Sequence, residues 1–320
     1  MLNFLFLALG IALLTGGGEA LIRGSLAAAH RLGVSPLLSG LLIVGFGTSM
    51  PELMVSVVAA LNEQPDIATG NVVGSNISNV LLILGTSALS RPMAVMPSAL
   101  RRDAVTGLAA SLVFVILAGK GALGGADGIL LLAGLASFLV WAYWSERFHA
   151  APSAELHKAE SEELTALPKS APWIVTMVIV GLSVLIFGSR MVLLGAVGIA
   201  QDLGISEAVI GLTLVAVGTS LPELSVSLIA ALRRHADVAI GNVLGSNIFN
   251  LLGILGISAL LQPLPVHARI LQFDQWIMLG SSVLLLLFLY TGRRLSRLEG
   301  GTLFAGYGAY IGLAFTAFGA

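Results

Sequence analysis

Residues 47–52 read GTSMPE within a long apolar stretch, and residues 218–223 repeat the pattern as GTSLPE. A proline inside a helix removes a backbone donor and clashes with the preceding turn, so we expect carbonyls near Gly45 to Thr48 to lose their partners. Thr48 and Glu52 are four residues apart, which places the hydroxyl and the carboxylate on one face if helical geometry is kept. Each copy therefore predicts a cluster of oxygen atoms with one negative charge.

A second motif follows each hexapeptide. It reads GNVVGSNISN at residues 70–79 and GNVLGSNIFN at residues 241–250. Helical spacing places Ser75 on the face of Asn79, and likewise Ser246 on the face of Asn250. Hydroxyl, amide and carbonyl oxygens are neutral ligands that hard cations such as calcium and sodium accept together with carboxylates.

The two motif pairs belong to one internal repeat. Residues 45–85 aligned with residues 216–256 give 25 identities in 41 positions at a constant offset of 171. The same offset places Gly24 and Gly33 on Gly195 and Gly204, so the repeat includes the segment before each motif. We therefore expect residues 1–32 to belong to the fold and not to be a cleaved signal peptide, for which a basic n-region is also missing.

The composition is that of a polytopic membrane protein. Hydrophobic residues make up 57% and charged residues 10% of 320 residues, and the mean hydropathy is +0.96. The predicted spans are 3–29, 35–61, 66–90, 100–119, 124–145, 173–200, 206–232, 237–261, 269–291 and 302–319. Five spans per half is an odd number, so the halves enter the membrane from opposite sides. We predict an all-α fold of ten transmembrane helices in two inverted five-helix repeats, with helices broken at the ion site.

Three regions follow from this reading. Residues 1–145 form the first repeat, residues 146–172 a polar linker, and residues 173–320 the second repeat. Twelve Lys and Arg residues in the loops or at the ends of the spans fall on the side of the linker, against Lys120 and Arg269 on the other. The positive-inside rule then places the linker in the cytoplasm and both termini outside the cytoplasmic membrane. We read the linker as a solvated connector.

Charge makes a metal cation the expected occupant of the repeated motifs. Neither motif contains Lys or Arg, so Glu52 and Glu223 have no counter-ion nearby in sequence, and a buried carboxylate is costly without one. Glycine-rich motifs alone are usually helix-packing faces, and a proline alone is usually a kink. Their coincidence with a glutamate and two hydroxyl residues, twice, favours a binding site. Glu19 aligns with Arg190 and lies outside this symmetry, so we expect it to be structural.

At these motifs the sequence resembles the calcium/cation antiporter superfamily, and most closely the prokaryotic sodium/calcium exchangers, across essentially all ten spans. The resemblance implies four clustered ion sites, with sliding of the first and sixth helices to alternate access. It implies a calcium site of the Glu52 and Glu223 carboxylates with the Thr48 and Thr219 carbonyls. The sodium sites implied add the backbone of Gly45 and Ala216, the hydroxyls of Ser49, Ser75, Ser220 and Ser246, and Asn79. Asn250 replaces an aspartate typical of archaeal and potassium-dependent relatives, which disfavours potassium cotransport.

The expected function is therefore sodium-for-calcium antiport, with calcium and sodium as transported ions, no cofactor, and the lipid bilayer as surroundings. A proton/calcium antiporter is the alternative, because glutamates serve protons as readily as sodium. A passive channel is disfavoured by the lack of a ring of pore-lining carboxylates. An intramembrane enzyme is disfavoured because no HExxH motif or nucleophile–base pair is visible. A net charge of −1 argues against nucleic acid, and a monomer is compatible with the sequence.

Overall fold

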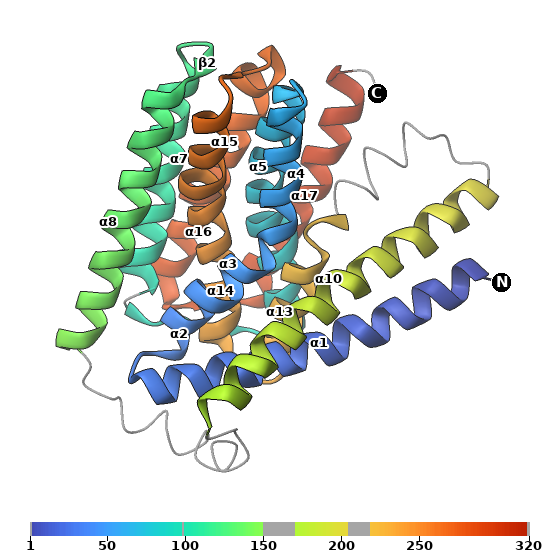
Figure 1. The fold of residues 1–320 in the computed structure, drawn as a ribbon, viewed down its shortest axis with the longest axis vertical. Coiled ribbons are helices and arrows are strands. Elements are labelled where there is room, and N and C mark those ends of the chain that lie inside the picture. The colour runs from blue at the N-terminus through green and yellow to red at the C-terminus, as the bar shows by residue number, and fades with distance from the viewer. Residues whose placement is uncertain (1, 98, 150–169, 204–217, 319–320) are drawn as a thin grey trace.

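The computed structural model describes residues 2–97, 99–149, 170–203 and 218–318, and these form a helical bundle (Figure 1). The first half contains α1 (Leu2–Leu32), α2 (Pro36–Ser39), η1 (Gly40–Gly45), α3 (Phe46–Thr48), α4 (Met50–Leu61), α5 (Pro65–Ser78), η2 (Asn79–Leu84), α6 (Gly85–Ser90), β1 (Met93–Ala94), η3 (Ala99–Ala104), α7 (Val105–Ala118), β2 (Ala122–Leu123) and α8 (Gly125–His149). The second contains α10 (Ala171–Asp202), α13 (Leu221–Leu232), α14 (Ala236–Ile248), η5 (Phe249–Ile254), α15 (Leu255–Leu261), β3 (Leu264–Pro265), η6 (Ile270–Asp274), α16 (Gln275–Gly292), β4 (Arg294–Leu295) and α17 (Arg297–Phe318). Segments labelled η are π-helical.

Helices α1 and α10 form a closely packed antiparallel pair that lies obliquely to the other helices (Figure 1). A Cβ on Gly10 would meet the Val192 amide nitrogen at 2.6 Å, and one on Gly17 would meet the Leu185 amide nitrogen at 2.9 Å. The later residue of α1 thus meets the earlier residue of α10, which shows that the two helices run antiparallel. Glycine is required at such points because the two backbones touch.

The break predicted at the first proline motif is present, but it falls at Ser49. The segments Pro36–Thr48 and Met50–Leu61 meet at an angle of 43° there. Pro51 lies in the first turn of α4, where its missing N–H would have had no intrahelical partner. Thr48 and Glu52 thus flank the break, and the expectation that they share a regular helical face is wrong.

Helix α14 lies at the centre of the bundle and is buried along nearly its whole length. A Cβ on Gly245 would lie 2.3 Å from the Leu41 carbonyl oxygen, and one on Gly241 would lie 2.5 Å from the Leu37 carbonyl oxygen. The glycines of the second motif therefore let η1 and α2 pack directly on the α14 backbone. This close packing brings the two proline motifs together.

Two short antiparallel ladders join the halves. Strand β1 pairs with β4, and β2 pairs with β3. The offset of 171 places β1 on β3 and the end of β2 on the start of β4, so each ladder is the counterpart of the other. Reciprocal pairing of this kind is what a pseudo-two-fold axis between the halves produces.

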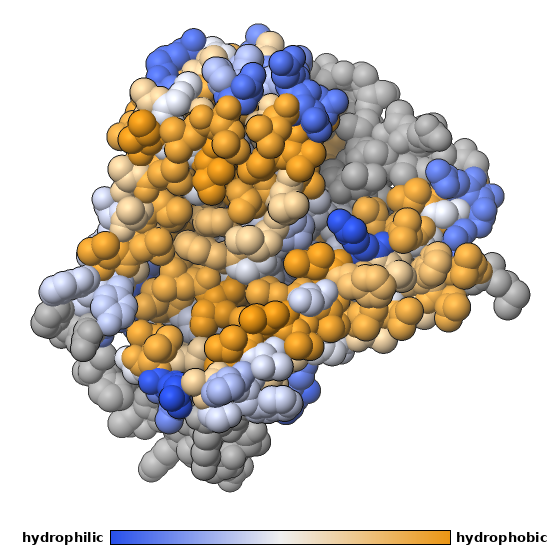
Figure 2. All heavy atoms as spheres, in the orientation of Figure 1, coloured by the Kyte–Doolittle hydropathy of each residue, from blue (hydrophilic) through white to orange (hydrophobic). Residues whose placement is uncertain are grey.

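The outer surface is apolar, whereas many polar groups are inside. Figure 2 shows hydrophobic residues across most of one face and hydrophilic residues gathered at its ends. Ile116, Leu287 and Tyr290 are 71%, 53% and 74% exposed, while Glu52 and Glu223 are each 1% exposed. Within the described residues, six helices are long and apolar enough to cross a membrane, or seven if the pair bent at Ser49 is one span. The chain is thus an all-α, multi-pass membrane protein, and the count falls short of the ten spans expected.

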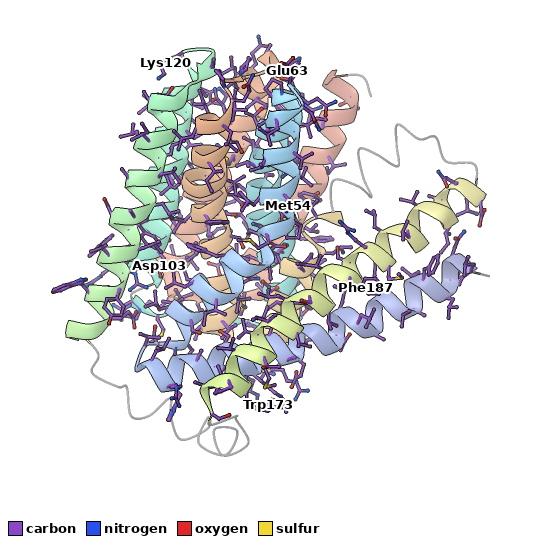
Figure 3. All side chains as sticks on the ribbon, in the orientation of Figure 1. Met54, Glu63, Asp103, Lys120, Trp173 and Phe187 are labelled. Carbon is purple, nitrogen blue, oxygen red and sulfur yellow. The ribbon has the colours of Figure 1, made fainter. Side chains whose placement is uncertain are left out.

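The two ends of the bundle are marked by labelled side chains. Figure 3 shows Glu63 and Lys120 at one end and Trp173 at the other. Glu63 follows α4, and Lys120 follows α7, so the helices of the first half alternate in direction across the bundle.

Candidate functional site

The two glutamates of the proline motifs are held in one buried cluster by serines from the opposite half. The Ser49 hydroxyl donates to Glu223 Oε1 at 3.1 Å, and the Ser220 hydroxyl donates to Glu52 Oε1 at 3.4 Å. The offset of 171 converts the first contact into the second. Each serine lies directly before its own helix, α4 or α13, so the starts of these two helices position each donor against the other half of the chain.

The cluster has more buried acceptors than donors. Glu52 Oε2, Glu223 Oε2, Asn79 Oδ1 and Asn250 Oδ1 are buried and accept no hydrogen bond from any described residue. No ion pair in the described part of the chain involves either glutamate. Unsatisfied buried oxygens each cost about 1–3 kcal/mol, and more when charged. Cations accept lone pairs from oxygen atoms, so a cation bound beside these atoms would reduce this deficit.

The Gly45 carbonyl, expected to be free, has partners. It accepts the Ser49 backbone N–H at 3.2 Å and the Ser246 hydroxyl at 3.0 Å. The reason is the position of the break: the helical hydrogen bond from Ser49 to Gly45 is still made before the chain bends. The Thr48 hydroxyl donates to Asn242 Oδ1 at 3.2 Å, so it contacts the second half of the chain.

The amides of the second motif are less symmetric. Asn79 Nδ2 donates to Asn247 Oδ1 at 2.9 Å, but the counterpart from Asn250 to Asn76 is not formed, and Asn76 Oδ1 is unpaired. Asn250 is 1% exposed. Within the described residues, one of the two repeat-related amide–amide hydrogen bonds is therefore formed and the other is not.

Two other predicted ligands are among the described residues, and one lies outside them. Ser75 is buried on α5, and Thr219 is partly buried in the turn before α13. Ala216 falls among residues 204–217, which the structure does not describe. These placements leave the individual ligand assignments as predictions.

Two residues of the second motif were not among the predicted site residues but hold both glutamate helices. Asn71 Nδ2 donates to the Glu52 carbonyl at 3.2 Å and to a serine hydroxyl one turn further along α4 at 3.0 Å. Asn242 Nδ2 makes the equivalent bonds to the Glu223 carbonyl at 3.2 Å and to a serine of α13 at 2.8 Å. Both halves of the repeat have asparagine at this position, and this match is the sequence signal that could have identified the two residues. They fix the depth at which each carboxylate sits.

Glu19, the acid that aligns with Arg190 in the repeat, stands apart from the cluster. Glu19 forms ion pairs with Arg23 at 2.8 Å and Arg233 at 3.4 Å, which agrees with the structural role expected of it. No group of three or more His, Cys, Asp or Glu residues that suits a metal occurs within the described ranges. The chemistry of the cluster is therefore two carboxylates surrounded by hydroxyl, amide and carbonyl oxygens, a donor set for hard cations.

Comparison with known proteins agrees with this geometry. The family model of the sodium/calcium exchanger protein matches residues 2–144 and 173–316. CaxA of Alkalimonas amylolytica is 38% identical over 98% of both chains, and the sodium/calcium exchanger MaX1 of Methanosarcina acetivorans is 35% identical over 98% of both. A solved structure of the sodium-calcium exchanger NCX_Mj superposes with a TM-score of 0.83 at 32% identity, covering 97% of this chain and 98% of that one.

The matched segments contain both motif pairs and leave out residues 145–172, which correspond to the polar linker. Relatives of this kind are membrane transporters and not enzymes. The chain belongs to the sodium/calcium exchanger protein family.

Proposed function

We propose that this cation/calcium antiporter exchanges sodium for calcium across the cytoplasmic membrane by alternating access. The observation that carries the proposal is the buried, reciprocally bonded pair Glu52 and Glu223, whose second oxygens have no donor within the described residues. Two carboxylates balance one divalent cation or two monovalent ones. The name of MaX1 and that of NCX_Mj, both sodium/calcium exchangers, support sodium as the counter-ion.

In this proposal calcium binds the Glu52 and Glu223 carboxylates and the Thr48 and Thr219 carbonyls. Sodium uses the same carboxylates together with the backbone of Gly45 and Ala216, the hydroxyls of Ser49, Ser75, Ser220 and Ser246, and Asn79. The Ser246 hydroxyl must turn away before the Gly45 carbonyl accepts an ion, because it donates to that carbonyl in the present conformation. Asn250 contributes no charge, so the two glutamates supply the whole formal charge of the site.

The proposed architecture is ten spans in two inverted repeats, residues 1–145 and 173–320, joined by a cytoplasmic linker at 146–172, with both termini outside. The antiparallel contact of α1 with α10 supports inversion, since the repeat offset relates these two helices. The reciprocal β ladders support it too. The distribution of Lys and Arg supports the direction of insertion.

Coupling follows from the charge of the empty site. Two ionised glutamates in a desolvated cluster repel each other, so we propose that the unloaded protein does not pass through the occluded state. Either calcium or sodium removes the repulsion and permits the change of access, carried by the α1–α10 pair sliding across the remaining helices. A ligand drives such a switch only through different affinities for the two states.

Calcium uptake into proteoliposomes under separate sodium, potassium and proton gradients tests the function. We expect saturable uptake driven by an outward sodium gradient, and none driven by a potassium gradient. Uptake driven only by a proton gradient would identify the second candidate, a proton/calcium antiporter, in which protons neutralise the same two glutamates. Uptake that needs no counter-ion gradient and does not saturate would contradict antiport.

A further inference from the structure

A cavity of about 570 Å³ lies where the η3–α7 segment meets α16, and neither glutamate of the cluster lines it. Helix α16 forms one wall with Leu286, Leu287 and Tyr290, and the η3–α7 segment forms the other with Arg101 and Val105. Leu287 is 53% exposed, so this wall opens toward the surroundings of the bundle. The cavity is thus an apolar groove at the surface of the membrane-spanning part.

The end of the groove is fixed by the β1–β4 ladder. The Val95 N–H donates to the Arg293 carbonyl at 2.9 Å, directly beside the ladder. Arg293 ends α16 in a left-handed backbone conformation, φ 48°, and its side chain lines the cavity. Its position is therefore set by hydrogen-bonded backbone on both sides of the groove.

Both arginines of the groove carry charge that the described protein does not neutralise. Neither Arg101 nor Arg293 forms an ion pair or side-chain hydrogen bond with a described residue. Arg102 provides the contrast, because it is 4% exposed and donates to Asp103 and Glu146. The groove thus combines an apolar wall with two free guanidinium groups at its rim.

The internal repeat supplies a comparison with the opposite side of the protein. The offset of 171 places Arg101 on Gln272 and Arg293 on Ala122. The counterpart positions near the other face therefore have neither charge. At these two repeat-related pairs of positions, arginine is present on the side that the positive-inside rule places in the cytoplasm, where anionic lipids attract basic groups, and absent on the other.

We propose that this groove binds one anionic phospholipid, with its phosphate between Arg101 and Arg293 and an acyl chain along the α16 wall. Basic pockets between transmembrane helices on the cytoplasmic side are suited to such headgroups. Guanidinium groups bind phosphate oxygens in a fork geometry, and the exposed Tyr290, two residues before the end of α16, is an amphipathic ring of the kind favoured at membrane interfaces. The proposal is independent of which ions the protein exchanges.

Binding of phosphatidylglycerol to purified full-length protein, counted by native mass spectrometry and by the rise in melting temperature, tests it. Each arginine near a membrane surface contributes about 1 kcal/mol, a factor of about five, so the Arg101→Gln/Arg293→Gln variant should bind about 25-fold more weakly. The matched control is Arg294→Gln/Arg297→Gln, which removes two exposed arginines of the same region that do not line the cavity. It should lose less than about twofold, because neither side chain lines the cavity and salt screens exposed charges that do not touch the headgroup.

A second variant protects the test against misfolding. Arg101→Lys/Arg293→Lys keeps both charges and should retain most of the affinity, so a loss in the Gln variant alone reports on charge. Equal binding by the Gln variant and the unmodified chain would overturn the proposal, as would an equal loss in the control. Displacement of phosphatidylglycerol by millimolar inorganic phosphate would identify a free-anion site instead. Equal retention of phosphatidylcholine would show that the apolar wall alone holds the lipid.

Discussion

Replacing Glu223 by Gln removes one charge from the ion site while leaving its shape nearly unchanged. Glu223 is 1% exposed, and its Oε1 accepts the Ser49 hydroxyl, a bond that a glutamine oxygen also accepts. The neighbouring contacts of the helix, such as Asn242 to the Glu223 carbonyl, involve backbone and are preserved. The substitution therefore isolates the contribution of one carboxylate charge.

The size of the effect follows from electrostatics. A divalent cation about 4 Å from a carboxylate centre gains roughly 8 kcal/mol at an effective dielectric constant near 20. Much of this is offset by desolvation, and removal of one partner from a buried charge pair typically costs about 3–5 kcal/mol. We therefore expect calcium affinity to fall by at least about 100-fold, with sodium-driven calcium uptake abolished. The same result is expected for Glu52→Gln, because the two residues are related by the repeat.

Two assays distinguish this from misfolding. Calcium at 100 times its Kd should stabilise the unmodified protein by about 2.7 kcal/mol, whereas a site weakened 100-fold retains about 0.4 kcal/mol at the same concentration. The ion-free melting temperature of the variant should be unchanged or higher, since a buried charge has been removed. Glu63→Gln, at an exposed position outside the site, is the matched control and should behave as the parent protein does.

A calcium-dependent rise in melting temperature that survives in the Glu52→Gln/Glu223→Gln variant would refute the reasoning. Sodium-driven calcium flux in that variant would refute it as well. Loss of the calcium effect in the Glu63→Gln control would show that the shift does not report on this site.

Four other substitutions, one of them with a matched control, have expected outcomes. Ser49→Ala and Ser220→Ala each delete a hydroxyl that donates to a glutamate of the other half, so each should slow exchange about 10- to 100-fold. Uptake assays in which only one of the two substitutions slows exchange would contradict the reciprocal geometry. Asn250→Asp adds a buried carboxylate to the cluster and should raise calcium affinity by about tenfold or more, measured by calcium-dependent melting; unchanged affinity would place Asn250 outside the site. Gly245→Ala places a Cβ 2.3 Å from a carbonyl oxygen of η1 and should lower the stability by about 1–3 kcal/mol or more. Gly16→Ala is the control, because no described atom lies within 4 Å of its Cβ, and equal melting temperatures for the two variants would contradict the close packing.

Much of the fold could be predicted because membrane and repeat leave clear signals in sequence. Long apolar stretches predicted helices that the structure contains, among them α1 and α10, because lipid requires every backbone group to bond within its own helix. The number of spans was harder to predict. The helix that bends at Ser49 is divided into two short pieces, and neither length nor hydropathy alone decides whether such pieces form one span.

Part of the site could be predicted for a similar reason. Glu52 and Glu223 were singled out because a repeated acid in an apolar stretch is costly, and the structure buries both in one cluster. Asn71 and Asn242 were missed because an asparagine in a glycine-rich motif has many possible partners, and spacing along the chain does not identify a backbone carbonyl on another helix as the acceptor.

The sequence by itself determined that this is a two-fold repeated membrane protein with an acid in each half, because a constant offset of 171 and the cost of charge in lipid require no knowledge of packing. Only the tertiary structure decided which groups face those acids. The helix breaks at Ser49, so the Thr48 and Ser49 hydroxyls bond to Asn242 and Glu223 of the other half and not to Glu52 of their own. The physical reason is that a bend of 43° at a single residue redirects the side chains before it. The position of this bend depends on packing between the two halves.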